Sequence, residues 1–359
     1  MEKERDMVRK IRGSVKRPAE PENMNKQSRS VRKAAGRKGP VRILVCLLLC
    51  GLLLSGCGRR EREAIRVGSL KGPTSIGILF LMDKAKNGGT DYTYTFQMAV
   101  GADELVALMV KGELDIALLP ANVAAVLYQK TDGGVAVIDI NTLGVLYIVT
   151  GTAEISEIAD LKGKTIYLTG KGTTPEASLK YILGQNGLTE NDYTLEYKSE
   201  AAEVAAVLAG NPAAVGLLPQ PFATAALMQN PGLGIAIDIN AEWIKAQGEN
   251  GSGMVTGVTV VRREFLEENR DAVEGFLREH QAAAAAVGDD AAAAAALAVE
   301  AGIVAKEAVA LKAVPQCNIT CITGEEMKKA LSAYLEVLAD FDAKLVGGEL
   351  PGDDFYYVP

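Results

Sequence analysis

The chain has 359 residues, of which 48% are hydrophobic, and its formal net charge is −7. This charge is uneven, because residues 1–42 carry 14 Lys and Arg against 5 Asp and Glu, whereas residues 58–359 carry 24 against 40. An acidic body of this kind lacks the basic footprint that nucleic-acid binding requires, so we expect no nucleic-acid partner. Its length is enough for two domains of ordinary size.

The N-terminal segment predicts export from the cytoplasm. Residues 43–54 are 12 uncharged residues after the basic segment, which is within the ~7–15 of a signal peptide and short of the ~20 of a spanning helix. Their continuation, Leu54-Ser55-Gly56-Cys57, resembles the lipobox of bacterial lipoproteins. The resemblance implies a signal peptide with a long basic leader over residues 1–56, a lipidated Cys57 at the outer face of the cell membrane, and a tether over residues 57–63. A start at Met24 instead of Met1 would give a leader of ordinary length.

Two blocks about a hundred residues apart share the same order of predicted elements, as two copies of one unit would. Each block begins with a strand, a glycine-containing turn and a helix, and it continues with a helix, a strand that stops at a proline, and a further helix. The first block has these elements at 64–70, 75–86, 102–111, 114–120 and 121–129, and the second at 164–169, 175–186, 201–209, 213–219 and 220–229. Alternating strands and helices predict mixed, mainly parallel sheets flanked by helices, hence an α/β protein with two lobes.

Apolar, β-branched segments lie between and after the two blocks, at 135–140, 146–149, 235–239 and 255–261. We interpret them as strands through which the chain passes between lobes, so that lobe 1 comprises 64–150 plus 255–359 and lobe 2 comprises 151–254. The C-terminal part is predicted to be helical. Its helices cover 265–281, an alanine-rich run to Ala301 that Asp289-Asp290 can cap, and 327–345, opened by Gly324-Glu325-Glu326.

A ligand of such a protein is expected in the cleft between the lobes, beyond the carboxyl ends of the strands, where loops lead into helix N-termini. The loops after the first strand of each block offer backbone N–H groups, hydroxyls and one lysine each to a polar or anionic group. Helix capping by Thr74 and Thr174 would explain the same threonines without a ligand. Glu176, in the first turn of its helix, would repel a strong anion if it pointed inward.

The loops at the other end of each unit add two amides and an aromatic ring, and Thr142 lies in the first crossover. Prolines and turn residues there have an equally good explanation as strand terminators and β-turns. The predicted ligand-binding residues are Lys71, Gly72, Thr74, Ser75, Asn122, Thr142, Thr173, Thr174, Gln220 and Phe222.

Of the five cysteines, only Cys317 and Cys321 lie outside the predicted signal peptide and its lipidation site. Outside the cytosol these two could form a disulfide, although their spacing alone does not establish the geometry. We expect no metal site, because a thiol site would need two more ligands and the one histidine, His280, is predicted at a solvated helix position. The chain also lacks G-x-S-x-G, Walker-type and H-E-x-x-H motifs, so we expect no enzyme and no cofactor.

These residues together resemble the solute-binding lipoproteins of ABC importers with the type 2 periplasmic-binding-protein fold, in the branch that includes binders of alkanesulfonates, nitrate, taurine and thiamine-pyrimidine precursors. The resemblance covers nearly all of residues 65–357. It rests on Leu70-Lys71-Gly72-Pro73-Thr74, on residues 112–117 (GELDIA), on residues 161–166 (LKGKTI) and on residues 348–357 (GELPGDDFYY).

The resemblance implies a monomeric, non-catalytic receptor whose lobes close on a small molecule and whose closed form docks on an ABC permease and ATPase complex. Eukaryotic pyrimidine synthases of the same branch carry a cysteine-rich motif and active-site histidines that this chain lacks. Two alternatives remain at this point. One is a sensory or structural lipoprotein that uses the same fold to bind a partner protein, and the other is an enzyme in which Lys71 or Lys171 forms a Schiff base.

Overall fold

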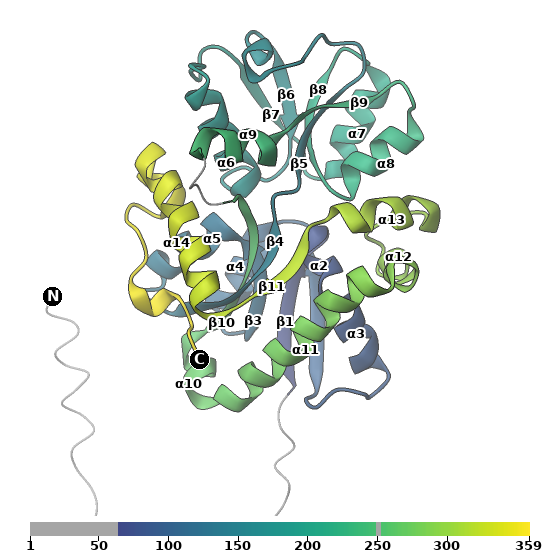
Figure 1. The fold of residues 1–359 in the computed structure, drawn as a ribbon. Helices are drawn as coiled ribbons and strands as arrows, with labels where there is room; N and C mark the ends of the chain where they lie inside the picture. Colours follow the sequence, from purple (N-terminus) through teal and green to yellow (C-terminus); the bar gives the residue numbers. More distant parts are fainter. Residues whose placement is uncertain (1–63, 249–252) are drawn as a thin grey trace, which may run out of the picture. The chain divides into compact units, whose positions relative to one another are not determined.

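The structure, a computed structural model, describes residues 64–248 and 253–359. Two sheets flanked by helices organise these residues (Figure 1). The predicted signal peptide, Cys57 and the tether lie outside the described residues. Within the described ranges, no single helix has the length and apolar composition of a membrane span. The helices Arg270–Asp289 and Ala291–Glu300 meet these two criteria only when taken together, and the pair is bent by 111° at the break.

The first sheet has six strands in the order β11-β4-β10-β3-β1-β2. β1 is parallel to both β2 and β3, and its register with β2 runs from Ile65 opposite Tyr94 to Leu70 opposite Ala99. β10 pairs antiparallel with β3 and with β4. The strands are β1 (Ile65–Leu70), β2 (Tyr94–Ala99), β3 (Ile116–Pro120), β4 (Val135–Leu143), β10 (Val255–Arg262) and β11 (Ile319–Ile322).

The second sheet has five strands in the order β7-β6-β8-β5-β9. β6 is parallel to β7 and β8, and β5 pairs antiparallel with β8 and β9. A parallel trio followed by an antiparallel strand therefore occurs in both sheets, and the predicted mixed α/β fold with two lobes is confirmed. The strands are β5 (Leu146–Thr150), β6 (Thr165–Leu168), β7 (Thr194–Tyr197), β8 (Val215–Pro219) and β9 (Gly234–Asp238).

The predicted boundary of lobe 1 at residue 150 is wrong. β5, which was placed at the end of lobe 1, lies between β8 and β9 in the second sheet, where Tyr147 is opposite Leu218 and Asp238. The chain therefore leaves the first sheet at Leu143 and enters the second at Leu146. It returns when β10 begins at Val255, next to the predicted boundary. The antiparallel strand beside the parallel trio, β10 in the first sheet and β5 in the second, therefore directly follows a crossover between the lobes. These crossovers couple the two lobes through the backbone.

The helices follow the predicted order of the two blocks. They are α2 (Pro73–Ile76), α3 (Leu79–Lys86), α4 (Ala102–Val110), α5 (Ala121–Lys130), α6 (Thr174–Gln185), α7 (Ala201–Gly210), α8 (Phe222–Gln229), α9 (Ile239–Gln247), α10 (Arg263–Glu268), α11 (Arg270–Asp289), α12 (Ala291–Glu300), α13 (Glu307–Ala313) and α14 (Gly324–Phe341). Short 3₁₀ segments lie at Ile158–Leu161, Val314–Gln316, Ala343–Val346 and Asp353–Phe355.

Three predicted helices differ from the observed ones. The helix expected at 75–86 is broken between α2 and α3, where a side chain at Gly77 would approach Ile319 to 3.1 Å. The helix expected at 265–281 is broken at Asn269, which has non-helical dihedral angles, and it continues to Asp289. α14 ends at Phe341, before the predicted Leu345, because the next residue, Asp342, caps the following 3₁₀ segment by accepting a hydrogen bond from the Lys344 N–H at 3.0 Å.

Five observed elements were not predicted from the sequence pattern: β2, β7, β11, α9 and α13. β7 and β11 have four residues each, and β2 has half-exposed positions along one face. Short strands at sheet edges bury little of their length, so they carry a weak alternation of apolar and polar residues. The two missed helices are short, with nine and seven residues.

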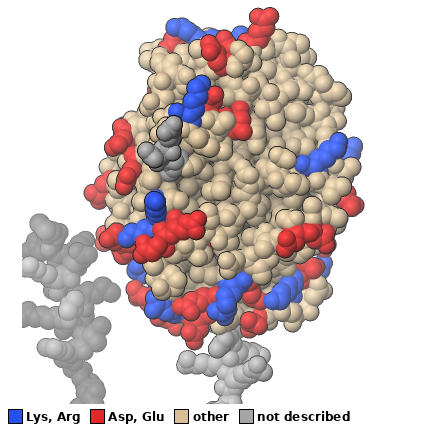
Figure 2. All heavy atoms as spheres, viewed as in Figure 1, with Lys and Arg blue, Asp and Glu red and all other residues tan. Residues whose placement is uncertain are grey.

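An apolar cluster continues from the first sheet into the second and includes residues of both. Its aromatic part joins three helices, because the ring of Trp243 in α9 lies 4.7 Å from Tyr181 in α6 and 4.9 Å from Tyr334 in α14, centroid to centroid. On the face that Figure 2 shows, charged side chains of both signs are interspersed, and much of the surface between them is uncharged.

Candidate ligand site

A cavity of about 310 Å³ lies where loops of both sheets lead into helices. Its lining comes from the loops after β1, β2, β6 and β7, as the position of carboxyl strand ends predicts. This volume is at the lower end of the ~300–1,000 Å³ typical of small-molecule pockets. The polar and charged residues of the lining are Lys71, Thr74, Asp103, Thr169, Lys171, Thr173, Ser199, Glu200 and Thr256.

Half of the predicted binding residues line this cavity and half do not. Lys71, Gly72, Thr74, Thr173 and Phe222 are part of its wall. The others are buried elsewhere and bonded within the protein. These are Ser75, whose hydroxyl is 2.6 Å from that of Ser69; Thr142, which donates to Asn141 Oδ1 at 2.9 Å; Gln220, whose Oε1 accepts from the Thr224 N–H at 3.2 Å; and the pair Asn122 and Thr174.

Asn122 connects the two lobes. Its Nδ2 donates to the Gly172 carbonyl at 2.9 Å and to the Leu345 carbonyl at 3.3 Å, and its Oδ1 accepts from the Thr174 hydroxyl at 3.2 Å. The side chain is 1% exposed. Asn122 begins α5 beside the first sheet, whereas Gly172 and Thr174 flank the start of α6 beside the second. The amide therefore satisfies partners across the lobe boundary.

Helix capping by Thr74 and Thr174 is also wrong. The residues that precede α2 and α6 are Gly72 and Thr173, and neither makes a side-chain capping bond. Thr74 lies inside α2 and donates its hydroxyl to the Leu70 carbonyl at 3.2 Å. Because Thr74 lines the cavity, its hydroxyl oxygen can still accept a hydrogen bond from a ligand.

Glu176 folds back onto its own loop. Its Oε2 accepts from the Gly172 N–H at 2.6 Å, and its Oε1 lies 2.9 Å from Lys180 Nζ. Burial favours a higher pKa for this carboxyl, but the hydrogen bonds from Gly172, Lys180 and Tyr197 outweigh it and hold the pKa below its ordinary value. The carboxylate thereby neutralises the positive end of α6.

The second lobe repeats this arrangement at α7, where Glu203 Oε2 accepts from the Ser199 N–H at 2.9 Å. On the first lobe, α2 has no acidic residue in its first turn and no side-chain cap. α4 also lacks a side-chain cap but carries Asp103 and Glu104 in its first turn. The start of α2, beside Lys71, therefore has no carboxylate from its own helix.

Thr256, on β10, is a cavity residue that the sequence analysis missed. Thr256 is 8% exposed, and its Oγ1 has no hydrogen-bond partner among the described residues. A buried hydroxyl left unbonded costs about 1–3 kcal/mol, and this one belongs to a residue of the cavity wall. A threonine in a β-branched strand gives no sequence signal of such a role.

Gly257 follows Thr256 and sets how closely β10 approaches the cleft. A Cβ at this position would lie 2.6 Å from Asn141 Oδ1 and 2.8 Å from Thr74 Cγ2. Both contacts are shorter than real Cβ atoms make, so a side chain here would push β10 away from α2. The glycine therefore allows the Thr256 and Thr74 side chains to share one wall.

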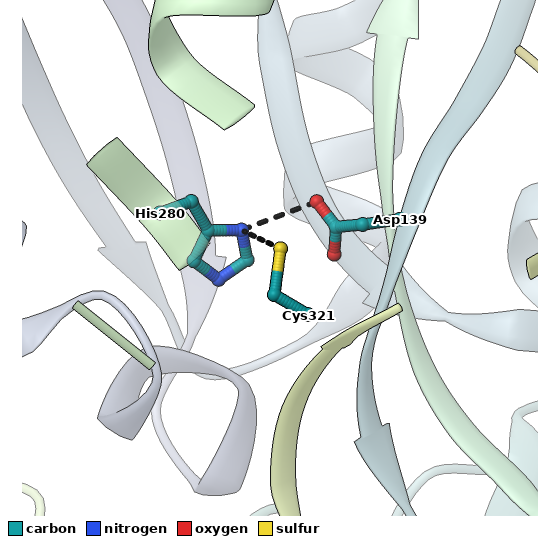
Figure 3. A group of neighbouring side chains, drawn as sticks. All are labelled: Asp139, His280 and Cys321. Atoms are coloured by element: carbon teal, nitrogen blue, oxygen red, sulfur yellow. Dashed lines mark hydrogen bonds and ion pairs between the residues drawn. The ribbon is translucent and has the colours of Figure 1, made fainter. Parts of the chain in front are cut away.

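The prediction that His280 is a solvated helix residue is wrong. Its side chain is fully buried, and Nδ1 lies 3.1 Å from Asp139 Oδ2 (Figure 3). The helix face that carries His280 packs against β4 and β11, which local helix periodicity does not reveal.

Cys317 and Cys321 do not form the disulfide that was considered, because both thiols are free. Cys317 Sγ donates to the Ala313 carbonyl at 3.4 Å, and Cys321 Sγ lies 3.9 Å from His280 Nδ1. Burial raises the pKa of both thiols.

Comparisons with known proteins agree with this architecture. Residues 87–233 match the model of a family described as ABC transporter, phosphonate, periplasmic substrate-binding protein. A crystal structure of an ABC transporter from Parabacteroides distasonis is 27% identical, with a TM-score of 0.67, and the match covers 82% of this chain and 98% of that one. A search of curated proteins found no match.

Two sulfonate-binding proteins share the fold at lower identity. The periplasmic aliphatic sulphonate binding protein SsuA from Escherichia coli is 17% identical, with a TM-score of 0.67 over 83% of this chain and 92% of that one. The alkanesulfonate-binding protein SsuA from Xanthomonas axonopodis pv. citri, bound to MOPS, is 17% identical, with a TM-score of 0.63 over 81% and 96%. The chain thus has the predicted type 2 periplasmic-binding-protein fold.

Proposed function

We propose that this protein is an extracytoplasmic solute-binding lipoprotein that captures a small polar or anionic molecule between its lobes and delivers it to an ABC importer. The observation that carries the proposal is the cavity of about 310 Å³ between loops of the two sheets, lined by Lys71 and Thr74 from one lobe and Lys171 and Thr173 from the other. The family that matches residues 87–233 consists of transporter substrate-binding proteins, which supports binding without catalysis.

Two lysines and the descriptions of similar proteins support an anionic ligand. Lys71 at the uncapped start of α2 suits an anionic head group, such as the phosphonate of the matching family's description or the sulfonate of the two structural neighbours. Lys171 lies on the second lobe, 5.5 Å from the centre of the Tyr197 ring, and Phe222 adds an apolar surface. Asp103, after β2 of the first sheet, and Glu200, after β7 of the second, add one carboxylate to each side of the cavity.

The anchor is part of the proposal. A diacylated Cys57 would hold the protein at the outer face of the membrane, because two acyl chains are what stable anchoring requires. We expect signal-peptide processing to stop in a Cys57→Ala variant and, separately, in the unaltered protein in the presence of globomycin. Unchanged processing under both conditions would contradict the lipoprotein assignment while leaving solute binding to be judged on its own.

A thermal-shift screen of the full chain in detergent tests solute capture. The probes are phosphonates, sulfonates, nitrate, pyrimidines, amino acids and polyamines. A ligand at 100 times its dissociation constant adds about 2.7 kcal/mol to the folded state, which is a clear rise in Tm. We expect a shift with one class of anion.

Two variants locate the binding site. Thr256→Val keeps the shape of the side chain and removes its hydroxyl, and Lys71→Gln removes the cation, so both should reduce the ligand-induced shift. Lys111→Gln is the matched control, because Lys111 is an exposed lysine at the end of α4 that does not line the cavity. A shift that both cavity variants retain in full would place the ligand elsewhere. The absence of any shift would contradict capture of these solutes and favour binding of a partner protein.

A further inference from the structure

Three side chains from distant parts of the chain meet away from the cavity (Figure 3). Asp139 comes from β4, His280 from α11 and Cys321 from β11. His280 Nδ1 is 3.1 Å from Asp139 Oδ2 and 3.9 Å from Cys321 Sγ, and the three potential ligand atoms all lie within 4.8 Å of one another. None of these residues lines the cavity described above.

The arrangement differs from that of a cysteine nucleophile with its base. In such a site the thiol contacts one imidazole nitrogen, which takes its proton, and the carboxylate contacts the other and orients the ring. Here the thiol and the carboxylate both face Nδ1. The second nitrogen, Nε2, is buried and has no partner in the described part of the chain. Three different donor atoms that converge on one point are instead what a metal ion requires.

The carboxylate is held in place from behind. Thr259 donates its hydroxyl to Asp139 Oδ1 at 2.8 Å, and Asn141 Nδ2 donates to Thr259 Oγ1 at 3.1 Å. All three side chains are fully buried. Oδ1 is thus engaged by a hydrogen bond, and Oδ2 is the oxygen directed at His280. Hydrogen bonds of this kind orient the ligands in metal sites.

The distances fit a small tetrahedral ion. Zinc bonds of about 2.0–2.3 Å to nitrogen, oxygen and sulfur place the donor atoms of a tetrahedral site roughly 3.3–3.8 Å apart. The separations of 3.1 and 3.9 Å from Nδ1 require shifts of a few tenths of an ångström, and the Asp139 carboxylate and Cys321 Sγ, which are within 4.8 Å of each other, must approach to the same range. Asp139 and His280 are fully buried, whereas Cys321 is partly exposed, so the ion can enter beside the sulfur.

We propose that Asp139, His280 and Cys321 bind one Zn²⁺ ion, with three protein ligands and a fourth position open beside Cys321. The mixture of imidazole, carboxylate and thiolate suits this borderline ion better than Mg²⁺ or Ca²⁺, which prefer oxygen ligands alone. On binding, the thiol releases its proton to solvent, and the imidazole carries its proton on Nε2 so that the Nδ1 lone pair faces the metal. The site would fix α11 to β4 and β11.

Metal titration of the full chain, purified in detergent, reduced and freed of metal with a chelator, tests the site. We expect calorimetry to show uptake of one equivalent of Zn²⁺, and Co²⁺ to give the near-ultraviolet charge-transfer absorption of a thiolate–cobalt bond. Cys321→Ser should abolish this absorption and weaken Zn²⁺ binding at least tenfold. Cys317→Ser is the matched control, because it changes the other free thiol of the described residues, keeps a donor for the Ala313 carbonyl, and should leave both readouts unchanged.

A second measurement uses the unaltered protein. Zn²⁺ should protect Cys321 from alkylation at least tenfold, as followed by mass spectrometry of the Cys321 peptide. Failure of the reduced protein to take up Zn²⁺, retention of the charge-transfer absorption in Cys321→Ser, or alkylation of Cys321 at an unchanged rate would each overturn the proposal. The anion-induced thermal shift is a separate readout, so solute capture and metal binding succeed or fail independently.

Discussion

Asp115 shows how one buried carboxylate joins three strands. It lies just before β3, and its Oδ1 contacts Arg66 of β1 at 2.5 Å and Arg262 of β10 at 3.0 Å. Its Oδ2 accepts from the backbone and side-chain N–H groups of Arg66, both at 2.9 Å. Burial favours a higher pKa for this carboxyl, but the hydrogen bonds from both arginines outweigh it and lower the pKa below its ordinary value.

We expect Asp115→Asn to reduce the free energy of unfolding by about 2 kcal/mol at pH 7. This is less than the ~3–5 kcal/mol for a fully buried pair, because solvent screens the Arg66 partner, which is 39% exposed. Since the folded pKa is lowered, the stabilisation is present above the unfolded pKa of about 4 and is lost as the pH falls through the folded value. Urea unfolding at pH 7 and pH 3 measures both effects.

Asp340→Asn is the control, because Asp340 is exposed on α14. It should leave stability within about 0.5 kcal/mol of the parent. A difference between Asp115→Asn and the parent protein that stays constant from pH 7 to pH 3 would contradict the assigned role of the carboxylate.

At the scale of elements, the junction between α11 and α12 contains a helix cap that the local sequence predicts. Asp290 lies between the two helices, and its Oδ1 accepts from the Ala293 N–H at 2.9 Å. This bond satisfies one of the N–H groups that the first turn of a helix leaves free. The alanine-rich segment is a packed helix, since Ala294, Ala295 and Ala298 are fully buried. The predicted cap and helix are both confirmed.

Asp290→Ala should lower the free energy of unfolding by about 1 kcal/mol, because it removes the cap of α12. Asp289→Ala is a closely matched comparison: it changes the adjacent aspartate, which ends α11 and makes no cap bond to α12. Its effect should stay within about 0.5 kcal/mol. Guanidinium unfolding of both variants measures the two free energies of unfolding. Equal reductions in the two variants would mean that the loss of the Asp290 cap is not the cause.

The connection between the lobes is a property of the whole molecule. The backbone passes between the sheets in two crossovers, and the Asn122 side chain adds hydrogen bonds to Gly172 and Thr174. A further bond of 3.0 Å joins Ser178 in α6 to Tyr334 in α14. Closure of a two-lobed binding protein depends on such contacts as well as on ligand, because both shift the balance between open and closed states.

Asn122→Ala should reduce the free energy of unfolding by about 1–3 kcal/mol, because the buried amide makes three hydrogen bonds that the variant loses. It should also raise the radius of gyration of the ligand-free protein in small-angle scattering and weaken apparent ligand affinity, since less of the protein is in the binding-competent state. Gln129→Ala serves for comparison, because Gln129 is on the same helix and its bond to the Glu349 carbonyl is exposed. Unchanged scattering of Asn122→Ala would contradict a role in closure.

The sequence by itself determined the features that depend on neighbours in the chain. The order of strands and helices in each block, the prolines Pro120 and Pro219 at strand ends, and the Asp290 cap follow from backbone preferences over a few residues. Lys71 and Thr173 were expected at the cleft because they occupy loops at the carboxyl ends of strands, and both line the cavity.

The tertiary structure alone decided which side chains face one another. His280 was expected in solvent, yet it meets Asp139 and Cys321, which are 141 and 41 residues away in the chain. Thr256 resembles any strand threonine until the cavity is seen beside it. Gln220 and Asn122 lie at predicted helix starts, but their amides bond to protein groups. Helix and strand periodicity identifies a buried face without identifying its partner, because that partner is brought to it by segments far along the chain.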